Sequence, residues 1–243
     1  LAEKYGIDTS DEAIRAAVEQ HNEVCRLIRA IGDFRKEANP RVTGYEFHIL
    51  TLVSYVAPKH LIVDKLRETL EEIKTREPDA ADKYRARVVF VGSEVDDVDV
   101  IRLVEESGAY VCADRFCYGS LPGRDEIILN DEEDVVKQVC RQVQGRAQCP
   151  RYWDMAKMTG RRDYVADLAK EYGADGIIYE QMKFCDPWAY ERMIGTIVLR
   201  DEHGYPVLAV DRPYSIGSSG QMRTRVQAFV ESIEIKKIQG GKK

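Results

Sequence analysis

The chain has 243 residues, of which 44% are hydrophobic and 9% aromatic, so it is long enough and apolar enough to bury a substantial core. Its 36 Lys and Arg and 42 Asp and Glu give a net charge of -6 with both signs interspersed, which argues against a generic nucleic-acid or membrane surface. No apolar run approaches the roughly 20 residues that span a bilayer, and the amino end lacks a basic-then-apolar signal pattern, so a cytoplasmic location is expected.

The first third of the chain is predicted to be helical. Thr9 and Glu12 fit a capping box that opens a helix, because a Thr side chain followed three residues later by Glu satisfies free backbone N–H groups. Hydrophobic residues then recur at helical spacing as far as Asn39-Pro40, where the helix is expected to end.

Two more helices are predicted before the pattern changes. Thr43 and Glu46 form a second capping box, and the apolar helix that follows ends at Pro58 and should be buried on most sides. A third helix covers residues 61–73. The charged stretch at residues 74–83 is interpreted as a linker.

Strands and helices alternate over the rest of the chain. Strand, helix, strand order predicts a parallel sheet with right-handed crossovers. The expected fold class is therefore α/β, with a helical N-terminal segment (residues 1–80) followed by an α/β domain (residues 81–243) that has a flavodoxin-like doubly wound parallel sheet of about four strands. The strands are expected at residues 87–91, 109–113, 176–179 and 206–210, and later helices near residues 131–143, 161–172, 186–200 and after 219.

The loops after the four strands should share one edge of the sheet. In an open α/β sheet, ligands bind in the crevice beyond the carboxyl ends of the strands. These loops cover residues 92–97, 114–130, 181–187 and 211–219. The second is long, and long connections in compact domains are often functional, although a surface insertion is the alternative.

Six cysteines are spread along the chain without a CxxC pair, which argues against a disulfide framework. Three fall inside helical or strand patterns, typical of structural thiols, whereas Cys117, Cys149 and Cys185 fall in loops. Cys117 and Cys185 each follow a strand, so their thiols could bind zinc or an iron–sulfur cluster. Taken alone, the pattern favours a buried Cys185 that acts as a small hydrophobic residue.

The last strand leads into a Gly- and Ser-rich loop and a helix. Free N–H groups at a helix start can bind an anion, and nearby arginines add positive charge. The alternative is a flexible loop whose serine caps the helix. The spacing fits neither a Walker loop nor the dinucleotide fingerprint. The candidate residues for this anion site are Ser218, Ser219, Gly220, Gln221, Arg223 and Arg225.

Several segments together resemble the 2-hydroxyacyl-CoA dehydratase family, which also contains the subunits of ATP-dependent benzoyl-CoA reductase. The resemblance covers essentially the whole chain, and two segments are the most specific: Phe-Cys-Asp-Pro-Trp at residues 184–188 and Gly-Gln-Met-Arg-Thr-Arg at residues 220–225. The other matching segments lie at residues 41–46, 92–94, 105–108, 175–179 and 227–231.

The resemblance implies a domain arrangement and a cofactor. In that family each subunit has two α/β domains joined by helices, and it binds a four-iron four-sulfur cluster through three cysteines, one of which lies in the C-terminal domain. Cys185 matches that ligand. Residues 1–80 then correspond to the inter-domain helices, and residues 81–243 to the C-terminal α/β domain that carries one cluster cysteine.

The resemblance also implies partners and chemistry. Related subunits pair as a heterodimer, and a separate ATP-hydrolysing iron–sulfur activator donates one electron under anaerobic conditions. The acyl-CoA thioester then forms a ketyl radical anion, which allows the 2-hydroxyl group to leave. The expected function is therefore that of a lyase, an (R)-2-hydroxyacyl-CoA dehydratase. The alternatives are a subunit of a benzoyl-CoA reductase and a cluster-free accessory subunit that binds CoA through residues 215–220.

Compared with the family pattern, the chain, whose sequence begins at Leu1, is expected to lack an N-terminal α/β domain. The cluster would be shared with that domain, so two of its ligands should lie outside this chain. Cys117 and Cys149 are expected near the site, not as ligands carried over from the family. The sequence identifies neither a catalytic residue nor the acyl substrate.

Overall fold

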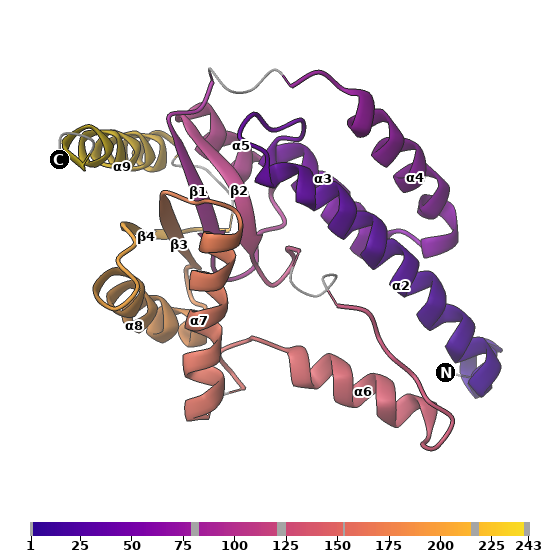
Figure 1. The fold of residues 1–243 in the computed structure, drawn as a ribbon. Coiled ribbons are helices and arrows are strands. Elements are labelled where there is room, and N and C mark those ends of the chain that lie inside the picture. Colours follow the sequence, from indigo (N-terminus) through magenta and orange to yellow (C-terminus); the bar gives the residue numbers. More distant parts are fainter. Residues whose placement is uncertain (1, 79–82, 121–124, 153, 215–218, 241–243) are drawn as a thin grey trace.

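One parallel sheet forms the centre of the α/β part of the molecule (Figure 1). The structure, a computed structural model, describes residues 2–78, 83–120, 125–152, 154–214 and 219–240. The strand order is β2-β1-β3-β4, so the chain reverses direction across the sheet between β1 and β3. The strands are β1 (Ala86–Val91), β2 (Ala109–Arg115), β3 (Gly176–Met182) and β4 (Val207–Arg212). This topology confirms the predicted doubly wound α/β fold.

Helices cover both faces of the sheet because its strands are apolar on both sides. Val88 and Phe90 of β1 pack toward α5 (Val98–Glu106) and α9 (Ser219–Gly240). Val89 and Val91 point to the other face and pack toward α7 (Met155–Glu171) and α8 (Asp186–Asp201). The two apolar clusters therefore form the two layers of core that a doubly wound sheet requires.

The helical segment has a hydrophobic core of its own. It contains α2 (Asp11–Asp33), α3 (Gly44–Val56) and α4 (Lys59–Thr75), together with the short α1 (Ala2–Tyr5) and the 3-10 helix η1 (Phe34–Lys36). Ile31 of α2, Phe47 of α3 and Leu66 of α4 meet in this core. The third helix and the second capping box were predicted, and both hydrogen bonds of the Thr43–Glu46 box are present.

Several predicted details of the first helices are wrong. Ser10, not Thr9, caps α2, because its side chain accepts a hydrogen bond from the Ala13 N–H. α2 ends at Asp33, several residues before the predicted end, and the chain then turns through η1. The apolar α3 is also less enclosed than predicted, since the Val56 side chain is 82% exposed.

A buried ion pair connects the helical segment to the sheet. Arg35 Nη1 lies 3.1 Å from Asp114 Oδ1, and the two side chains are 1% and 5% exposed. The Arg35 guanidinium also stacks 3.5 Å from the centre of the Phe47 ring. Asp114, near the end of β2, accepts a second hydrogen bond of 2.7 Å from the Ser120 N–H. The pair therefore orders residues 116–120, the first part of the loop that follows β2.

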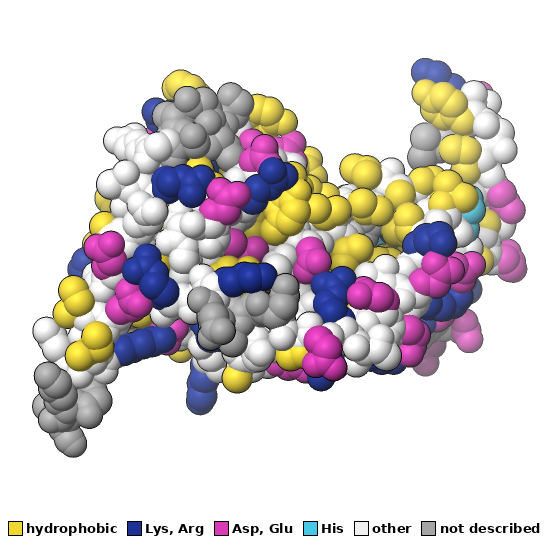
Figure 2. Space-filling view, turned by 90° about the horizontal axis from the view of Figure 1, so that it is seen from above, with side chains coloured by type: hydrophobic (Ala, Val, Ile, Leu, Met, Phe, Trp, Pro, Cys, Tyr) yellow, Lys and Arg dark blue, Asp and Glu magenta, His cyan; other side chains and the backbone are white. Residues whose placement is uncertain are grey.

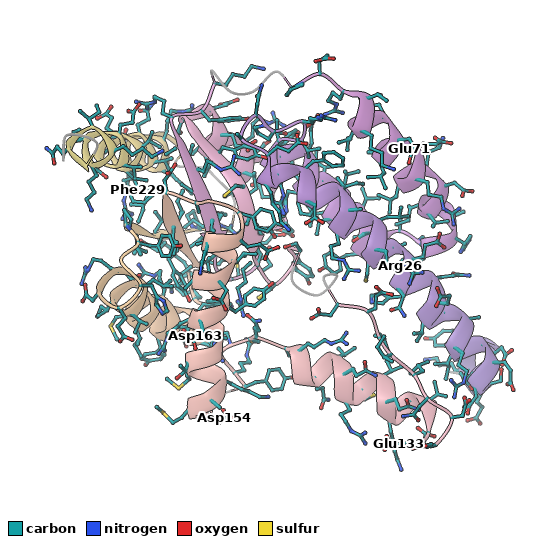
Figure 3. All side chains as sticks on the ribbon, viewed as in Figure 1. Arg26, Glu71, Glu133, Asp154, Asp163 and Phe229 are labelled. Carbon is teal, nitrogen blue, oxygen red and sulfur yellow. The ribbon has the colours of Figure 1, made fainter. Side chains whose placement is uncertain are left out.

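The long connection after β2 returns along α2 before it reaches α6 (Val135–Arg146). We call residues 125–134 the strap. Asn22 of α2 exchanges two hydrogen bonds of 2.8 Å with the Ile127 backbone. Arg26, in the middle of α2 in Figure 3, forms an ion pair of 2.6 Å with Glu126. These bonds hold the strap and α6 against α2, away from the sheet (Figure 1).

Charged side chains of both signs are interspersed on the face of the molecule that Figure 2 shows. This distribution agrees with the mixed charge pattern of the sequence. Among the described residues, the helices are all too short or too polar to cross a membrane.

We expect Asp114→Ala to lower the free energy of unfolding by about 3–5 kcal/mol, because the Arg35 charge would remain buried without its partner. The measurement is urea denaturation. The matched control is Asp64→Ala, which removes an exposed ion pair with Arg67 and should cost less than about 1 kcal/mol. A loss equal to that of the control would contradict a structural role for the buried pair.

Candidate functional site

The loop after β1 is bound to the end of β3 at the carboxyl edge of the sheet, where the strand order reverses. Glu180 Oε2 of β3 accepts hydrogen bonds from the Ser93 N–H (3.1 Å) and the Ser93 hydroxyl (2.9 Å). Ser93 Oγ accepts one from the Met182 N–H at 2.7 Å. Arg212 of β4 completes the network through a buried ion pair of 2.9 Å with Glu180. The loop after β1 is thereby fixed to the end of β3.

This contact requires glycine at position 92. A Cβ atom there would lie 2.4 Å from the Glu180 carbonyl oxygen and 2.5 Å from its Oε2. Both distances are shorter than any tolerable contact, so a larger residue would push the two loops apart. Burial raises the pKa of Glu180 to about 7, although Arg212 and Ser93 stabilise the carboxylate.

Cys185 lies at a strained turn between β3 and α8. Phe184, directly before it, has a φ of 71°, in the left-handed region that side chains other than glycine rarely adopt. Such strain costs about 1–3 kcal/mol and is concentrated at functional sites. The Phe184 side chain is 97% exposed, whereas the Cys185 thiol is half-buried. As predicted, Cys185 immediately precedes α8, which carries Pro187 in its first turn.

The structure brings the three loop cysteines into one neighbourhood, around the buried Trp188. Desolvation raises the pKa of Cys117, even though its side chain reaches solvent, and the nearby Cys149 and Cys185 add to the rise. The Trp188 indole N–H and the Arg115 guanidinium favour the Cys117 thiolate and oppose the rise. Trp188 Nε1 has no hydrogen bond of normal geometry among the described residues, so a buried donor remains available there.

Thiol groups in this neighbourhood have the soft sulfur chemistry that an iron–sulfur cluster needs. Within the described ranges, however, three or more His, Cys, Asp or Glu side chains do not converge on one point. The residues present therefore fit part of a ligand set. Cys25 and Cys112 are buried, as expected of structural thiols, and burial raises their pKa to about 11 and about 12. Cys140, the third cysteine in a helix or strand pattern, is exposed on α6 instead.

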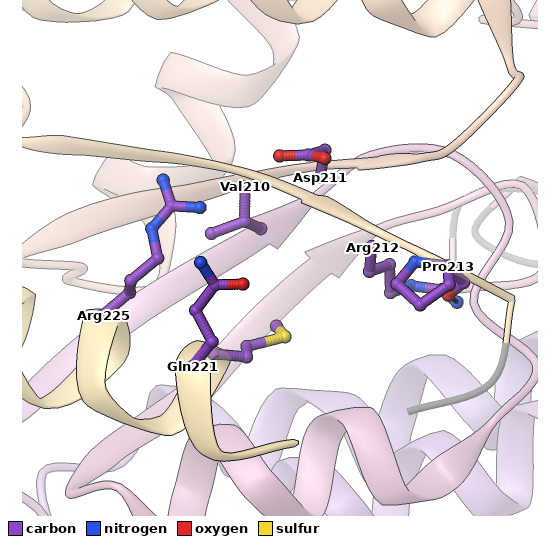
Figure 4. A pocket seen from close by; sticks show the side chains of 7 residues that line it. Val210, Asp211, Arg212, Pro213, Gln221 and Arg225 are labelled. Atoms are coloured by element: carbon purple, nitrogen blue, oxygen red, sulfur yellow. Dashed lines mark hydrogen bonds between the residues drawn. The ribbon is translucent and has the colours of Figure 1, made fainter. Parts of the chain in front are cut away.

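The predicted anion site at the start of α9 is only partly described. Ser218 lies outside the described residues, and α9 begins at Ser219 and Gly220. Gln221 and Arg225 line a small pocket of about 30 Å³ next to Asp211 (Figure 4). Arg225 donates a hydrogen bond of 2.6 Å to the Ala209 carbonyl, and Arg223 forms an ion pair of 2.8 Å with Glu106 of α5.

A larger pocket was not foreseen from the sequence. It has a volume of about 800 Å³, and its lining includes Cys117 and Cys149 together with four Arg and Lys side chains, those of Arg115, Arg146, Lys157 and Arg161. Its walls come from α2, the strap, α6, α7 and the loop after β2. The one available signal was that Arg115 and Arg146 lie within three residues of loop cysteines.

Comparison with known proteins gives a consistent result. The family model for the D-component of 2-hydroxyglutaryl-CoA dehydratase matches residues 1–233. The chain is 25% identical to the (R)-phenyllactyl-CoA dehydratase beta subunit of Clostridium sporogenes, over 94% of this chain and 59% of that protein. It is 25% identical to the beta subunit of (R)-2-hydroxyglutaryl-CoA dehydratase from Acidaminococcus fermentans (96% and 61%).

A relative of a different named activity is also similar. The chain is 22% identical to a benzoyl-CoA reductase subunit of Thauera aromatica, over 95% of this chain and 59% of that protein. The chain thus spans about three fifths of the length of these relatives.

The raised pKa of Glu180 predicts a pH dependence of stability. Between its ordinary value of 4.5 and about 7, the unfolded chain releases this proton while the folded chain keeps it, so the contribution of Glu180 to stability falls as pH rises. We expect Glu180→Gln to reduce the decline in unfolding free energy across this window. Part of the decline should remain, because Glu94 and Glu105 also have pKa values raised to about 7.

Urea denaturation at several pH values between about 5 and 7 measures the effect. The control is Glu202→Gln at the exposed end of α8, which should leave the decline unchanged. Equal slopes for Glu180→Gln and the unmodified protein would contradict the assignment.

Proposed function

The chain belongs to the 2-hydroxyglutaryl-CoA dehydratase D-component family, and on this premise we propose that it forms part of an activator-dependent iron–sulfur (R)-2-hydroxyacyl-CoA dehydratase, a lyase. The family match over residues 1–233 carries the proposal. The relatives named as dehydratase subunits support a dehydratase-type enzyme.

Cys185 is the proposed cluster ligand in this chain. Its support is the strained turn at Phe184, which fixes the thiol at the carboxyl edge of the sheet, where ligands of α/β sheets bind. Bound there, a four-iron four-sulfur cluster would supply the single electron for ketyl-radical chemistry at an acyl-CoA thioester. The other ligands are proposed to come from outside the described residues, because among those residues Cys185 has no two partners that converge with it.

Two buried aromatic residues near Cys185, Trp188 and Tyr179, have roles in this proposal. The buried Trp188 indole N–H can donate a hydrogen bond to a ligand atom beside the cysteines. The buried Trp188 and Tyr179 rings, with centroids 6.2 Å apart, form an apolar wall that excludes water. Exclusion of water protects a reactive intermediate from side reactions.

We further propose a homologous second subunit and an ATP-dependent iron–sulfur activator as partners. The relatives are named as subunits, which supports assembly with another chain. An exposed apolar row next to Cys185 supports a protein contact at this face. The row consists of Phe184, Tyr190, Met193 and Ile197, with exposed fractions of 97%, 69%, 57% and 49%.

A benzoyl-CoA reductase type subunit is the second candidate function, because one relative is named as a subunit of that reductase. The two activities differ in their products: one releases water from a 2-hydroxyacyl thioester, and the other reduces an aromatic thioester. An anaerobic assay of the natural full-length protein, with its partner subunit and activator, against 2-hydroxyacyl-CoA and benzoyl-CoA substrates separates them. Turnover of benzoyl-CoA alone would overturn the dehydratase proposal.

We expect Cys185→Ser to lower the iron and sulfide content of the anaerobically purified full-length protein at least severalfold, because a hydroxyl group is a poor ligand for iron–sulfur clusters. Cys140→Ser is the matched control, since Cys140 is an exposed cysteine within helix α6 and not in a loop at the carboxyl edge of the sheet. Unchanged iron in Cys185→Ser would reject the ligand assignment. Absence of iron from the unmodified protein would instead favour a cluster-free accessory subunit that binds CoA.

The start of α9 is proposed as an additional contact for acyl-CoA through Gly220, Gln221, Arg223 and Arg225, with Ser218 and Ser219 before them. We expect the double substitution Arg223→Ala and Arg225→Ala to weaken acyl-CoA binding at least about tenfold, because the loss of even one hydrogen bond to a charged group costs about 1.5–3 kcal/mol. Lys236→Ala, an exposed charge near the other end of α9, is the control. Equal affinities by calorimetry would reject this contact.

A further inference from the structure

The 800 Å³ pocket is a built cavity with walls from several elements. Arg115, Phe116 and Cys117 form the part nearest the sheet, and α7 contributes one wall. The strap and α6 contribute the opposite wall. Asn22 and Arg26 of α2 hold that wall in place through the hydrogen bonds and ion pair with Ile127 and Glu126.

Arg115 is a buried charge without a carboxylate partner in the described part of the chain. It is 2% exposed, and its Nε donates a 2.9 Å hydrogen bond to Gln148 Oε1. Its Nη2 donates to the Gln148 carbonyl, and the guanidinium lies 4.7 Å from the centre of a Trp188 ring. Burial of an uncompensated charge is costly, so an arginine in this position indicates that a negative group binds there.

Two further cations in the pocket also have only neutral partners among the described residues. Arg146 donates to the backbone carbonyls of Asp125 and Glu126 at 3.0 and 2.6 Å, and to the Gln142 side-chain oxygen. Lys157 lies 5.4 Å from the centre of the Tyr152 ring.

The other charged side chains of the pocket do not cancel the positive charge of Arg115, Arg146 and Lys157. Arg161, the fourth cation, is neutralised by Glu191 at 3.0 Å, and the one carboxylate in the described lining belongs to Asp125. The pocket is therefore cationic, although the chain has a net charge of -6.

We propose that this pocket binds a diphosphate group attached to an organic body. Three cations from three elements suit an extended polyanion better than a single carboxylate. Arg115 adds a buried positive charge at one end of the pocket, while its Nε and Nη2 groups donate to Gln148. The volume lies in the usual range of ligand pockets, and Phe116, Ile127 and Val143 provide apolar surface for the organic body.

Two sources share this chemistry: coenzyme A and a nucleoside diphosphate. The choice of coenzyme A rests on the proposed function, whereas the diphosphate site rests on the geometry of the pocket. Trp188 provides a local probe, because the Arg115 guanidinium lies over its ring. Trp153→Phe leaves Trp188 as the one tryptophan of the two in this sequence.

The experiment titrates the Trp153→Phe protein with pyrophosphate, ADP and coenzyme A, and follows Trp188 fluorescence and calorimetric heat. We expect saturable binding of pyrophosphate, with affinity about tenfold lower in Arg146→Ala and in Lys157→Ala. Lys137→Ala, an exposed lysine on α6 outside the pocket, is the matched control and should bind like the parent. Arg115→Lys tests the buried guanidinium, with circular dichroism to verify its fold.

The outcomes separate the two proposals. Pyrophosphate affinities that are equal in the parent, Arg146→Ala and Lys157→Ala would overturn the pocket assignment, as would the absence of saturable binding. Coenzyme A affinity that depends on Arg223 and Arg225 but not on Arg146 or Lys157 would exclude coenzyme A as the ligand of this pocket, while the proposed function would stand. Binding of pyrophosphate and ADP in the pocket without any affinity for coenzyme A would support the site and count against the proposed function.

Discussion

The buried ion pair between Arg35 and Asp114 is the contact on which the arrangement of the site depends. It joins η1, directly after α2, to the end of β2. Arg35 also accepts a hydrogen bond from Arg87 of β1 through its backbone carbonyl, so the same residue contacts two strands. The second carboxylate oxygen of Asp114 accepts the Ser120 N–H, so the same side chain holds the start of the following loop. The loop that carries Cys117 is thereby fixed relative to both the sheet and α2.

A second buried ion pair acts at the same edge of the sheet, two strands away. Glu180 and Arg212 join β3 to β4, and Ser93 extends this network to the loop after β1. The two networks order the loops on both sides of the point where the strand order reverses. Cys185 follows one of these ordered regions and Cys117 the other. The approach of the two thiols is therefore a property of the sheet topology and its charged edge.

The sequence predicted the fold class because alternation of apolar strands with capped helices leaves few arrangements that bury both faces of a sheet. It predicted β3 too short, since the apolar run ends at Tyr179 although Glu180, Gln181 and Met182 continue to pair with β4. Glu180 is buried through Arg212 and Ser93, and these partners cannot be recognised from neighbouring residues. The position of Cys185 was predictable because Pro187 marks a helix start.

The large pocket could not be predicted either, because it also depends on contacts between residues far apart in the sequence. Its opposite walls are α7 and the strap with α6, and the strap is held by side chains of α2 that are about one hundred residues distant in sequence, such as the pair Asn22 and Ile127. Local patterns carry no information on such contacts. Arg115 also falls at the end of a strand pattern, where a charged residue is ordinary, so only its burial distinguishes it.

The turn at Phe184 has an energetic consequence for assembly. In the isolated chain Phe184 has two energetic costs: its backbone is strained, and its large aromatic ring is exposed to water. Burial of a Phe side chain contributes about 1.5–3 kcal/mol, comparable to the strain of about 1–3 kcal/mol at this position. A surface that covers the ring would therefore offset the cost of the conformation that orients Cys185. The geometry of the thiol and the association of the protein would then be thermodynamically linked through one residue.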